Sequence, residues 1–228
     1  MKLETELKSI EIIHEVLTGK DDEKVCQQFM KNFGSEIEQF EKVMAIVYEH
    51  WRTFDAKFSK TEDSALVTAL LLKVVNGHIM SFRLLITGYW VAAGNTQRQV
   101  FEGCAMAIIA SKNEWPYLKR YMENRFSINK AIDVLKRRWT ELNIRKEAVL
   151  KLENGIIFYD GLSHPTLLTL TEMIAIDGSH NVYIGTCFDS SKIEGYKKEI
   201  EGRIGFAKII NNMISGVERN MRSWNLKS

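Results

Sequence analysis

Three charged residues in the most apolar part of the chain are the first candidates for chemistry. Arg83 lies in the apolar stretch 66–93, and Arg98 and Glu102 follow four residues apart, on one face of the next predicted helix. We assume that these two helices pack antiparallel about a turn at 88–95, so that the numbers of two facing residues add up to about 183. The residue that faces Arg83 is then close to position 100, which lies between Arg98 and Glu102. A carboxylate shared by two guanidiniums offsets much of the cost of burying them. The sequence therefore predicts an Arg83–Glu102–Arg98 cluster, which is either an ion-pair clip or an anion pocket.

Two histidines are candidates for the same polar cluster. His78 lies among apolar residues, where it is either a hydrogen-bonded core residue or a ligand. His164 precedes Pro165 and follows Tyr159 and Asp160, and a continuing helix would place Asp160 and His164 on one face. A catalytic zinc needs three protein ligands, so we predict no metal site here and no cofactor.

No complete catalytic motif is present in the sequence. Glu11 and His14 form a single Glu-x-x-His pair, whereas di-iron bundles need two such pairs and further glutamates. The sequence lacks a G-x-S-x-G elbow, and Gly19-Lys20 lacks the rest of a phosphate-binding loop. Whether the protein is an enzyme stays open on this evidence.

The elements that would position these residues are helices. Only two prolines occur, and apolar residues recur every three or four positions, as on one face of a helix. We predict an all-α bundle whose centre is an antiparallel pair of apolar helices, 64–87 and 96–111. The other helices are expected at 3–18, 22–33, 35–54 (opened by a Ser35–Glu38 capping box), 116–124, 127–139, 145–162 (interrupted by Gly155) and 191–224.

One segment departs from the helical pattern. Residues 165–188 contain Asp177-Gly178 between two apolar runs, which is a hairpin signal. The sequence predicts a small hairpin or irregular excursion there, with a short helix at 166–175 as the alternative. Because no linker or repeat is found, residues 1–228 are predicted to form a single domain, of which 1–60 could be a peripheral helical extension.

Charge is distributed unevenly along the chain. Residues 1–63 have a net charge of −5, residues 112–151 of +6, and residues 190–228 of +4. Three interpretations are open. The charged regions could be solvated helix faces, or the basic region 112–151 could bind nucleic acid. The acidic and basic regions could also pair with each other, within a chain or between subunits.

The sequence favours a cytoplasmic protein. Three cysteines without a CxxC pair are typical of a reducing compartment, and the N-terminus has no signal-peptide pattern. Lys73, His78 and Arg83 interrupt the stretch 66–93, so we read it as a core helix and expect no membrane association.

Three short segments carry a resemblance to known proteins. Residues 78–88, 98–102 and 159–165 resemble a group of uncharacterised bacterial all-helical proteins, in which an arginine–glutamate helix precedes a serine–histidine turn. The chain more distantly resembles HEPN helical domains of toxin–antitoxin and phage-defence systems. Many HEPN domains are dimeric, metal-independent ribonucleases with an arginine four to six residues before a histidine. None of the five histidines here has an arginine at that spacing, so the resemblance implies a shared bundle architecture and not the ribonuclease activity.

Three functions are compatible with these patterns. The first is a non-catalytic helical interaction protein that self-associates, most simply as a homodimer. The second is a nucleic-acid-acting or defence-related HEPN-like protein that uses the basic region 112–151. The third is a small-molecule or metal enzyme in the bundle core, built around His78, Glu102 and His164.

Overall fold

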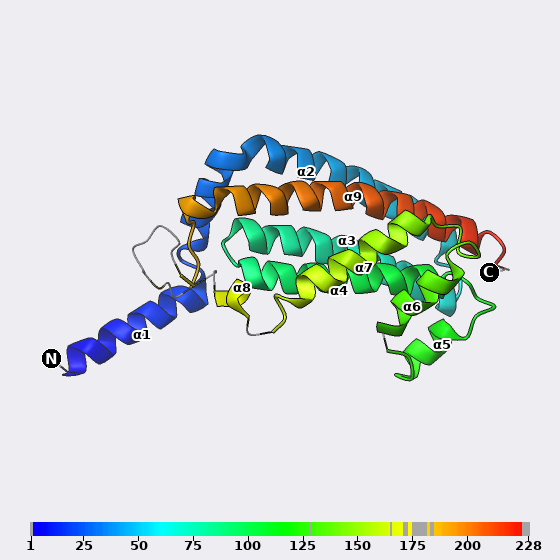
Figure 1. Ribbon diagram of the computed structural model, residues 1–228, viewed down its shortest axis with the longest axis horizontal. Helices are drawn as coiled ribbons and strands as arrows, with labels where there is room; N and C mark the ends of the chain where they lie inside the picture. Colours follow the sequence, from blue (N-terminus) through cyan, green and yellow to red (C-terminus); the bar gives the residue numbers. More distant parts are fainter. Residues whose placement is uncertain are drawn as a thin grey trace.

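Helices form almost all of the regular structure in this computed structural model, which describes residues 2–127, 129–164, 166–170, 173–174, 182 and 185–224. The predicted all-α bundle is confirmed, and no β-strand occurs among these residues (Figure 1). The helices are α1 (Lys2–Thr18), α2 (Asp22–Phe58), α3 (Glu62–Ile86), α4 (Trp90–Ala110), α5 (Tyr117–Met122), α6 (Asn129–Arg138), α7 (Lys146–Asp160), α8 (Leu167–Leu170), the 3₁₀ turn η1 (Ser190–Lys192) and α9 (Ile193–Met221).

The helices α3 and α4 form the predicted central antiparallel pair and share the most extensive contact of the bundle. A capping box opens α3, because the Thr61 hydroxyl accepts from the Ser64 backbone N–H and the Ser64 hydroxyl accepts from the Thr61 backbone N–H. Gly88 follows α3 at a φ of +91°, which a residue without a Cβ adopts readily. The turn between the two helices is therefore tight.

The register of this pair differs from the prediction. Helix α4 begins at Trp90, six residues before the predicted start, so the turn does not extend over 88–95. Gly94 is helical, and its missing Cβ leaves room for the Leu162 side chain. His78 consequently faces Gln97, and facing residue numbers sum to about 175 rather than 183.

Helix α2 contains the predicted break as a kink. Phe33 leaves helical geometry with φ −135° and ψ 26°, next to Gly34, yet the helix continues beyond it. The predicted Ser35–Glu38 capping box is wrong, because the Ser35 hydroxyl donates to the Glu36 carboxylate at 2.7 Å. Helix α2 packs lengthwise against α9 and α3, and the core side chains of α2 and α9 include Phe40, Val47, Phe54, Ile200, Ala207 and Ile214.

Helix α7 lies across α4 and is not interrupted at Gly155, contrary to the prediction. The glycine has a packing role, because a Cβ added at Gly155 would lie 2.7 Å from Cζ of Phe101 on α4. The short helix α6 packs on α4 and α7, and α5 contacts the α4 side of the same end. These contacts place α7 and α9 on two sides of α4.

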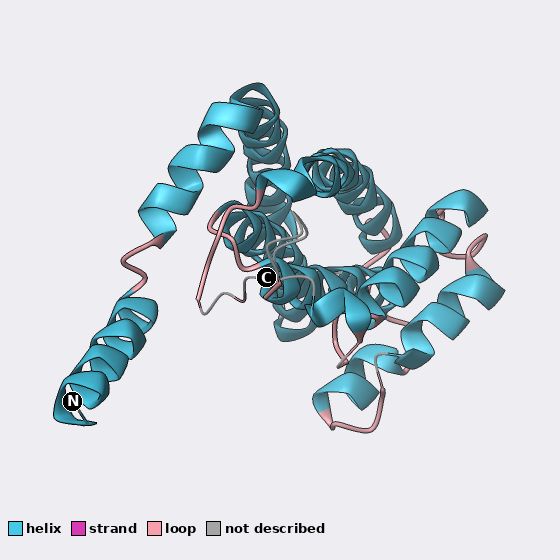
Figure 2. Ribbon diagram, turned by 60° about the vertical axis from the view of Figure 1, so that its left-hand side comes forward, coloured by secondary structure: helices cyan, strands magenta, loops and turns pink. Residues whose placement is uncertain are grey.

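Helix α1 projects from the bundle (Figure 2), and Figure 1 shows it at the opposite end of the molecule from α5 and α6. The next helix, α2, is part of the bundle. Within the segment 1–60, the peripheral part is therefore α1 alone.

The predicted excursion is described only in part. Ile174 and Val182 form an isolated antiparallel bridge, which agrees with a hairpin. Helix α8 is the short helix expected as the alternative, limited to Leu167–Leu170. The predicted turn at Asp177-Gly178 lies outside the described residues.

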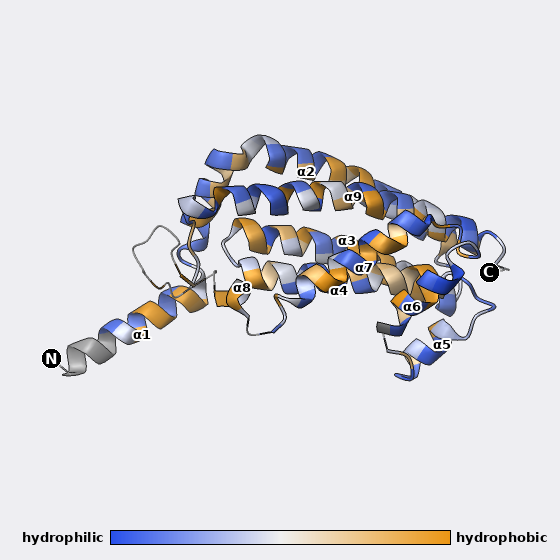
Figure 3. Cartoon of the chain, viewed as in Figure 1, coloured by the Kyte–Doolittle hydropathy of each residue, from blue (hydrophilic) through white to orange (hydrophobic). Residues whose placement is uncertain are grey.

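Figure 3 shows hydrophobic residues along α3 and α4, the central helices of the bundle. Helix α3 is long and apolar enough to span a membrane by length and composition, and half of its most apolar window is buried in the bundle. Its position between α2, α4 and α9 is that of a core helix.

Candidate functional site

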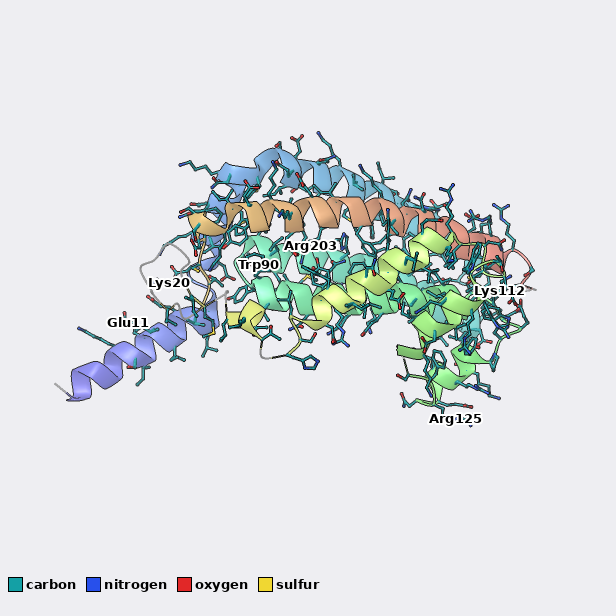
Figure 4. The ribbon with its side chains drawn as sticks, in the orientation of Figure 1. Glu11, Lys20, Trp90, Lys112, Arg125 and Arg203 are labelled. Carbon is teal, nitrogen blue, oxygen red and sulfur yellow. The ribbon has the colours of Figure 1, made fainter. Side chains whose placement is uncertain are left out.

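Arg203 is the centre of a buried polar network beneath α9 (Figure 4). The side chain is only 1 % exposed, and its Nε donates to the Ser81 hydroxyl on α3 at 3.1 Å. Its Nη1 donates to the Glu199 backbone oxygen at 3.2 Å and forms an ion pair with the Glu199 carboxylate. Nη2 has no hydrogen-bond partner among the residues that the structure describes. A buried guanidinium with an unpaired N–H group destabilises the fold unless another group pairs with it. Arg203 is therefore a candidate for binding a ligand or for a structural role in the network.

His78 connects this network to α4. Its Nδ1 lies 2.8 Å from Gln97 Oε1, and its Nε2 lies 2.9 Å from the Arg203 backbone oxygen. Complete burial of the ring lowers the pKa of His78 from 6.5 to about 4. The imidazole is therefore neutral at pH 7 and unsuited to act as a general acid.

The proton count at His78 constrains its neighbours. A neutral imidazole has one N–H, yet both ring nitrogens face an oxygen atom. With the proton on Nε2, toward the Arg203 carbonyl, both contacts are satisfied if the Gln97 amide turns its NH₂ group to Nδ1. Whichever way the Gln97 amide is turned, only one of its two polar atoms contacts His78. In the orientation of the structure, the other amide atom, Gln97 Nε2, is buried without a hydrogen-bond partner among the described residues.

Tyr159 completes the network from α7. Its hydroxyl donates to the Glu199 carboxylate at 3.0 Å, and its ring lies 5.8 Å from the Arg203 guanidinium carbon. Burial raises the pKa of Tyr159 well above its usual value of 10.0. The phenol is thus a fixed hydrogen-bond donor to the Glu199–Arg203 pair at neutral pH.

A second cluster lies on the neighbouring face of α4. Arg98 Nε is 3.2 Å from the Glu102 carboxylate, and Arg98 Nη1 is 3.0 Å from the Asp160 carboxylate on α7. The exposed His164 ring lies 3.9 Å from the same Asp160 carboxylate. Arg98, Glu102 and Asp160 border a pocket of about 300 Å³, which also touches Glu153 and apolar residues of α6 and α7.

Five of the six residues proposed from the sequence divide between the two clusters. His78 and Tyr159 belong to the buried network, whereas Arg98, Glu102 and His164 lie around Asp160. Arg83 belongs to neither cluster. It is exposed on α3, and no ion pair joins it to Glu102 in the described part of the chain.

The Arg98–Glu102 pair of the predicted cluster is confirmed, whereas the inclusion of Arg83 is wrong because the predicted register of α3 and α4 was wrong. Because α4 starts early, the α4 residues that face Arg83 lie about two helical turns before the predicted ones, and Arg83 cannot reach Glu102. The third member of the cluster is Asp160 instead of Arg83, and it pairs with Arg98.

Sequence reasoning missed the central residues of the buried network. Glu199 and Arg203 are four apart, and they occupy the apolar face of α9 between Tyr196, Ile200 and Ala207. Two opposite charges on the buried stripe of an amphipathic helix are a detectable signal for an internal ion pair.

The two clusters can bind polar groups and hold them in place. Burial also raises the pKa of the Cys104 thiol well above its usual value, which keeps the sulfur protonated and unreactive. Among the described residues, no three His, Cys, Asp or Glu side chains gather as a metal site would require.

Comparisons with known proteins give no match: no family model, no curated protein and no solved structure matches the chain. The resemblances to bacterial helical proteins and to HEPN domains therefore stay predictions.

Proposed function

We propose that this protein is a helical interaction protein that forms a homodimer, in which the acidic helix α1 of each chain packs on the basic α5–α6 end of the other. The observation that supports the proposal is the position of α1 outside the bundle, where its apolar side chains are exposed to solvent. A partner surface would bury these side chains.

One face of α1 is apolar and unpartnered. Ile10, Ile13 and Leu17 follow the spacing of a single helical face, and Ile10 and Leu17 are 64 % and 80 % exposed. An isolated helix of 17 residues is marginally stable in water, so α1 gains from packing on another surface. The sequence of α1 contains four glutamates and two lysines, a net charge of −2.

The opposite end of the molecule has the complementary chemistry. Helices α5 and α6 border a pocket of about 360 Å³ with four cationic side chains and one carboxylate. Aromatic rings form part of its wall, and the neighbouring Met122 side chain is exposed. The lining residues are Tyr117, Arg120, Arg125, Phe126, Lys130, Asp133, Val134 and Arg137.

The two surfaces cannot meet within one chain. Figure 4 shows Glu11 on α1 and Arg125 after α5 at opposite ends of the molecule. Two copies that lie side by side in opposite directions would bring each α1 to the basic end of the other. Such an arrangement is a closed two-fold dimer, the commonest symmetry of soluble oligomers.

Sedimentation velocity of the purified protein tests this proposal. At physiological ionic strength we expect a dimer for the unaltered chain and a monomer for Leu17→Asp, with unchanged helix content by circular dichroism. The matched control is Ile46→Asp, since Ile46 is 61 % exposed on α2 and lies outside the proposed contact. A monomeric wild type, or a Leu17→Asp variant that stays dimeric, would contradict the proposal.

A nucleic-acid surface is the second candidate for the same basic end. The Tyr117 and Phe126 rings lie 5.1 Å apart among the cationic side chains, and aromatic rings beside arginines can stack on bases. Binding of a single-stranded oligonucleotide that weakens steeply with salt, together with a monomeric protein, would favour this function over the dimer.

A further inference from the structure

A groove runs along α4 between α7 and α9. Two adjoining pockets, of about 340 Å³ and 530 Å³, share Lys151 on α7 and Ile209 on α9 as lining residues. The first pocket reaches the buried network and is bordered by Gln97, Tyr159 and Arg203. Together the pockets have the size of a small-molecule site.

The network end of the groove presents unused polar atoms. Arg203 Nη2 and one polar atom of the Gln97 amide, Nε2 in the orientation of the structure, both belong to residues in the wall of the first pocket, and neither has a hydrogen-bond partner among the described residues. Each side chain is 1 % exposed, so neither is solvated by bulk water. A ligand atom in the pocket would relieve the cost of these buried groups.

Charge at this end favours a singly charged anion. Arg203 already shares its charge with Glu199, and Lys151 at the pocket border is exposed and forms no ion pair in the described part of the chain. One net positive charge therefore remains for a ligand. A carboxylate matches it, whereas a doubly charged phosphate would add an uncompensated charge near Glu199.

The rest of the groove has a mixed lining, which includes the charged residues Arg145, Glu147 and Arg219. Its apolar lining includes Cys104, Ile108, Leu152, Ile209 and Met213. On α9, Gly202 and Gly205 line the first pocket, and a Cβ added at either would meet no atom within 4 Å. The glycines thus keep the wall open where a larger side chain would fill it.

We propose that this groove binds a small amphipathic carboxylate, with its carboxylate at Arg203 and Lys151 and its apolar body along α4. The site is separate from the surfaces assigned to self-association, since neither α1 nor the α5–α6 pocket contributes a lining residue.

Isothermal titration calorimetry with octanoate, below its micelle concentration, tests this site. We expect saturable one-to-one binding of octanoate and at least tenfold weaker binding of octanol, which has a similar body without the charge. Inorganic phosphate should bind at least tenfold more weakly as well.

Three variants separate the groove from non-specific binding. Lys151→Gln should weaken octanoate binding about fivefold and leave octanol binding unchanged, whereas Lys146→Gln, outside the groove, should have no effect. Gly205→Phe fills the pocket from an open position and should abolish binding while the thermal midpoint stays within a few degrees. The proposal is overturned if octanol binds as well as octanoate, if phosphate binds better, if no ligand binds, or if Gly205→Phe binds like the wild type.

Discussion

At the scale of single residues, the main feature of the buried network is an ion pair between Arg203 and Glu199 that is shielded from water. The Arg203 guanidinium is held by Glu199 and Ser81, and Tyr159 donates to the same carboxylate. Removing one charge of such a pair leaves the other uncompensated, which costs far more than the pair contributes to stability. The side chains from α3, α7 and α9 that meet here also fix the positions of these helices relative to one another.

Replacement of Arg203 should therefore be severely destabilising. We expect Arg203→Met to lower the free energy of unfolding by about 3–5 kcal/mol, and the double variant with Glu199→Gln to recover part of that loss. Lys136→Met is the matched control, because Lys136 forms an exposed ion pair with Glu153 and its replacement should cost far less. Urea titration at pH 7 measures all three, and a loss for Arg203→Met no larger than the control would contradict the network.

His78 should make stability depend on pH. The folded ring has a pKa of about 4 and the unfolded ring one near 6.5, so the unfolded chain binds more protons between these values. The contribution of neutral His78 is fully present above pH 6.5 and is lost as the pH falls toward 4, by up to about 3 kcal/mol. Urea titrations of wild type and His78→Gln between pH 4 and 7 isolate this contribution as a difference, and parallel curves would show that His78 makes none.

At the scale of elements, the helices were largely predictable and their register was not. Apolar periodicity located α3 closely, since this signal is local. The start of α4 depends on Gly94, which looks like a turn residue in the sequence but is helical because α7 packs closely against it. An error of six residues at that start was enough to assign Arg83 the wrong partner, whereas the Arg98–Glu102 pair within one helix was correctly predicted.

Glycines in α7 and α9 should respond oppositely to alanine. Gly155→Ala should destabilise the protein, because the new Cβ would lie within 3 Å of the Phe101 ring, although alanine favours helix. Gly202→Ala should stabilise it by about 0.5–1 kcal/mol, since the added Cβ meets no atom within 4 Å. Thermal unfolding of the two variants checks the close approach of α7 to α4, and two changes of the same sign would argue against it.

At the scale of the whole molecule, acidic and basic segments of the sequence lie far apart in the structure. The acidic helix α1 and the basic α5–α6 pocket lie at opposite ends, with the bundle between them (Figures 1 and 4). The sequence left open whether the two charged regions pair within a chain, pair between chains or bind nucleic acid. The positions of the two ends leave pairing between chains or binding of another molecule.

A charge-exchange experiment tests the reciprocal dimer most directly. One variant contains Glu11→Lys and Glu15→Lys on α1, and the other contains Arg120→Glu and Lys130→Glu in the α5–α6 pocket. Each variant alone places like charges in both contacts of its dimer, so sedimentation should show monomers. An equal mixture makes both contacts complementary again, and we predict a heterodimer. A mixture that stays monomeric while the wild type is dimeric, or variants that dimerise unaided, would contradict the proposed contact between α1 and the basic end.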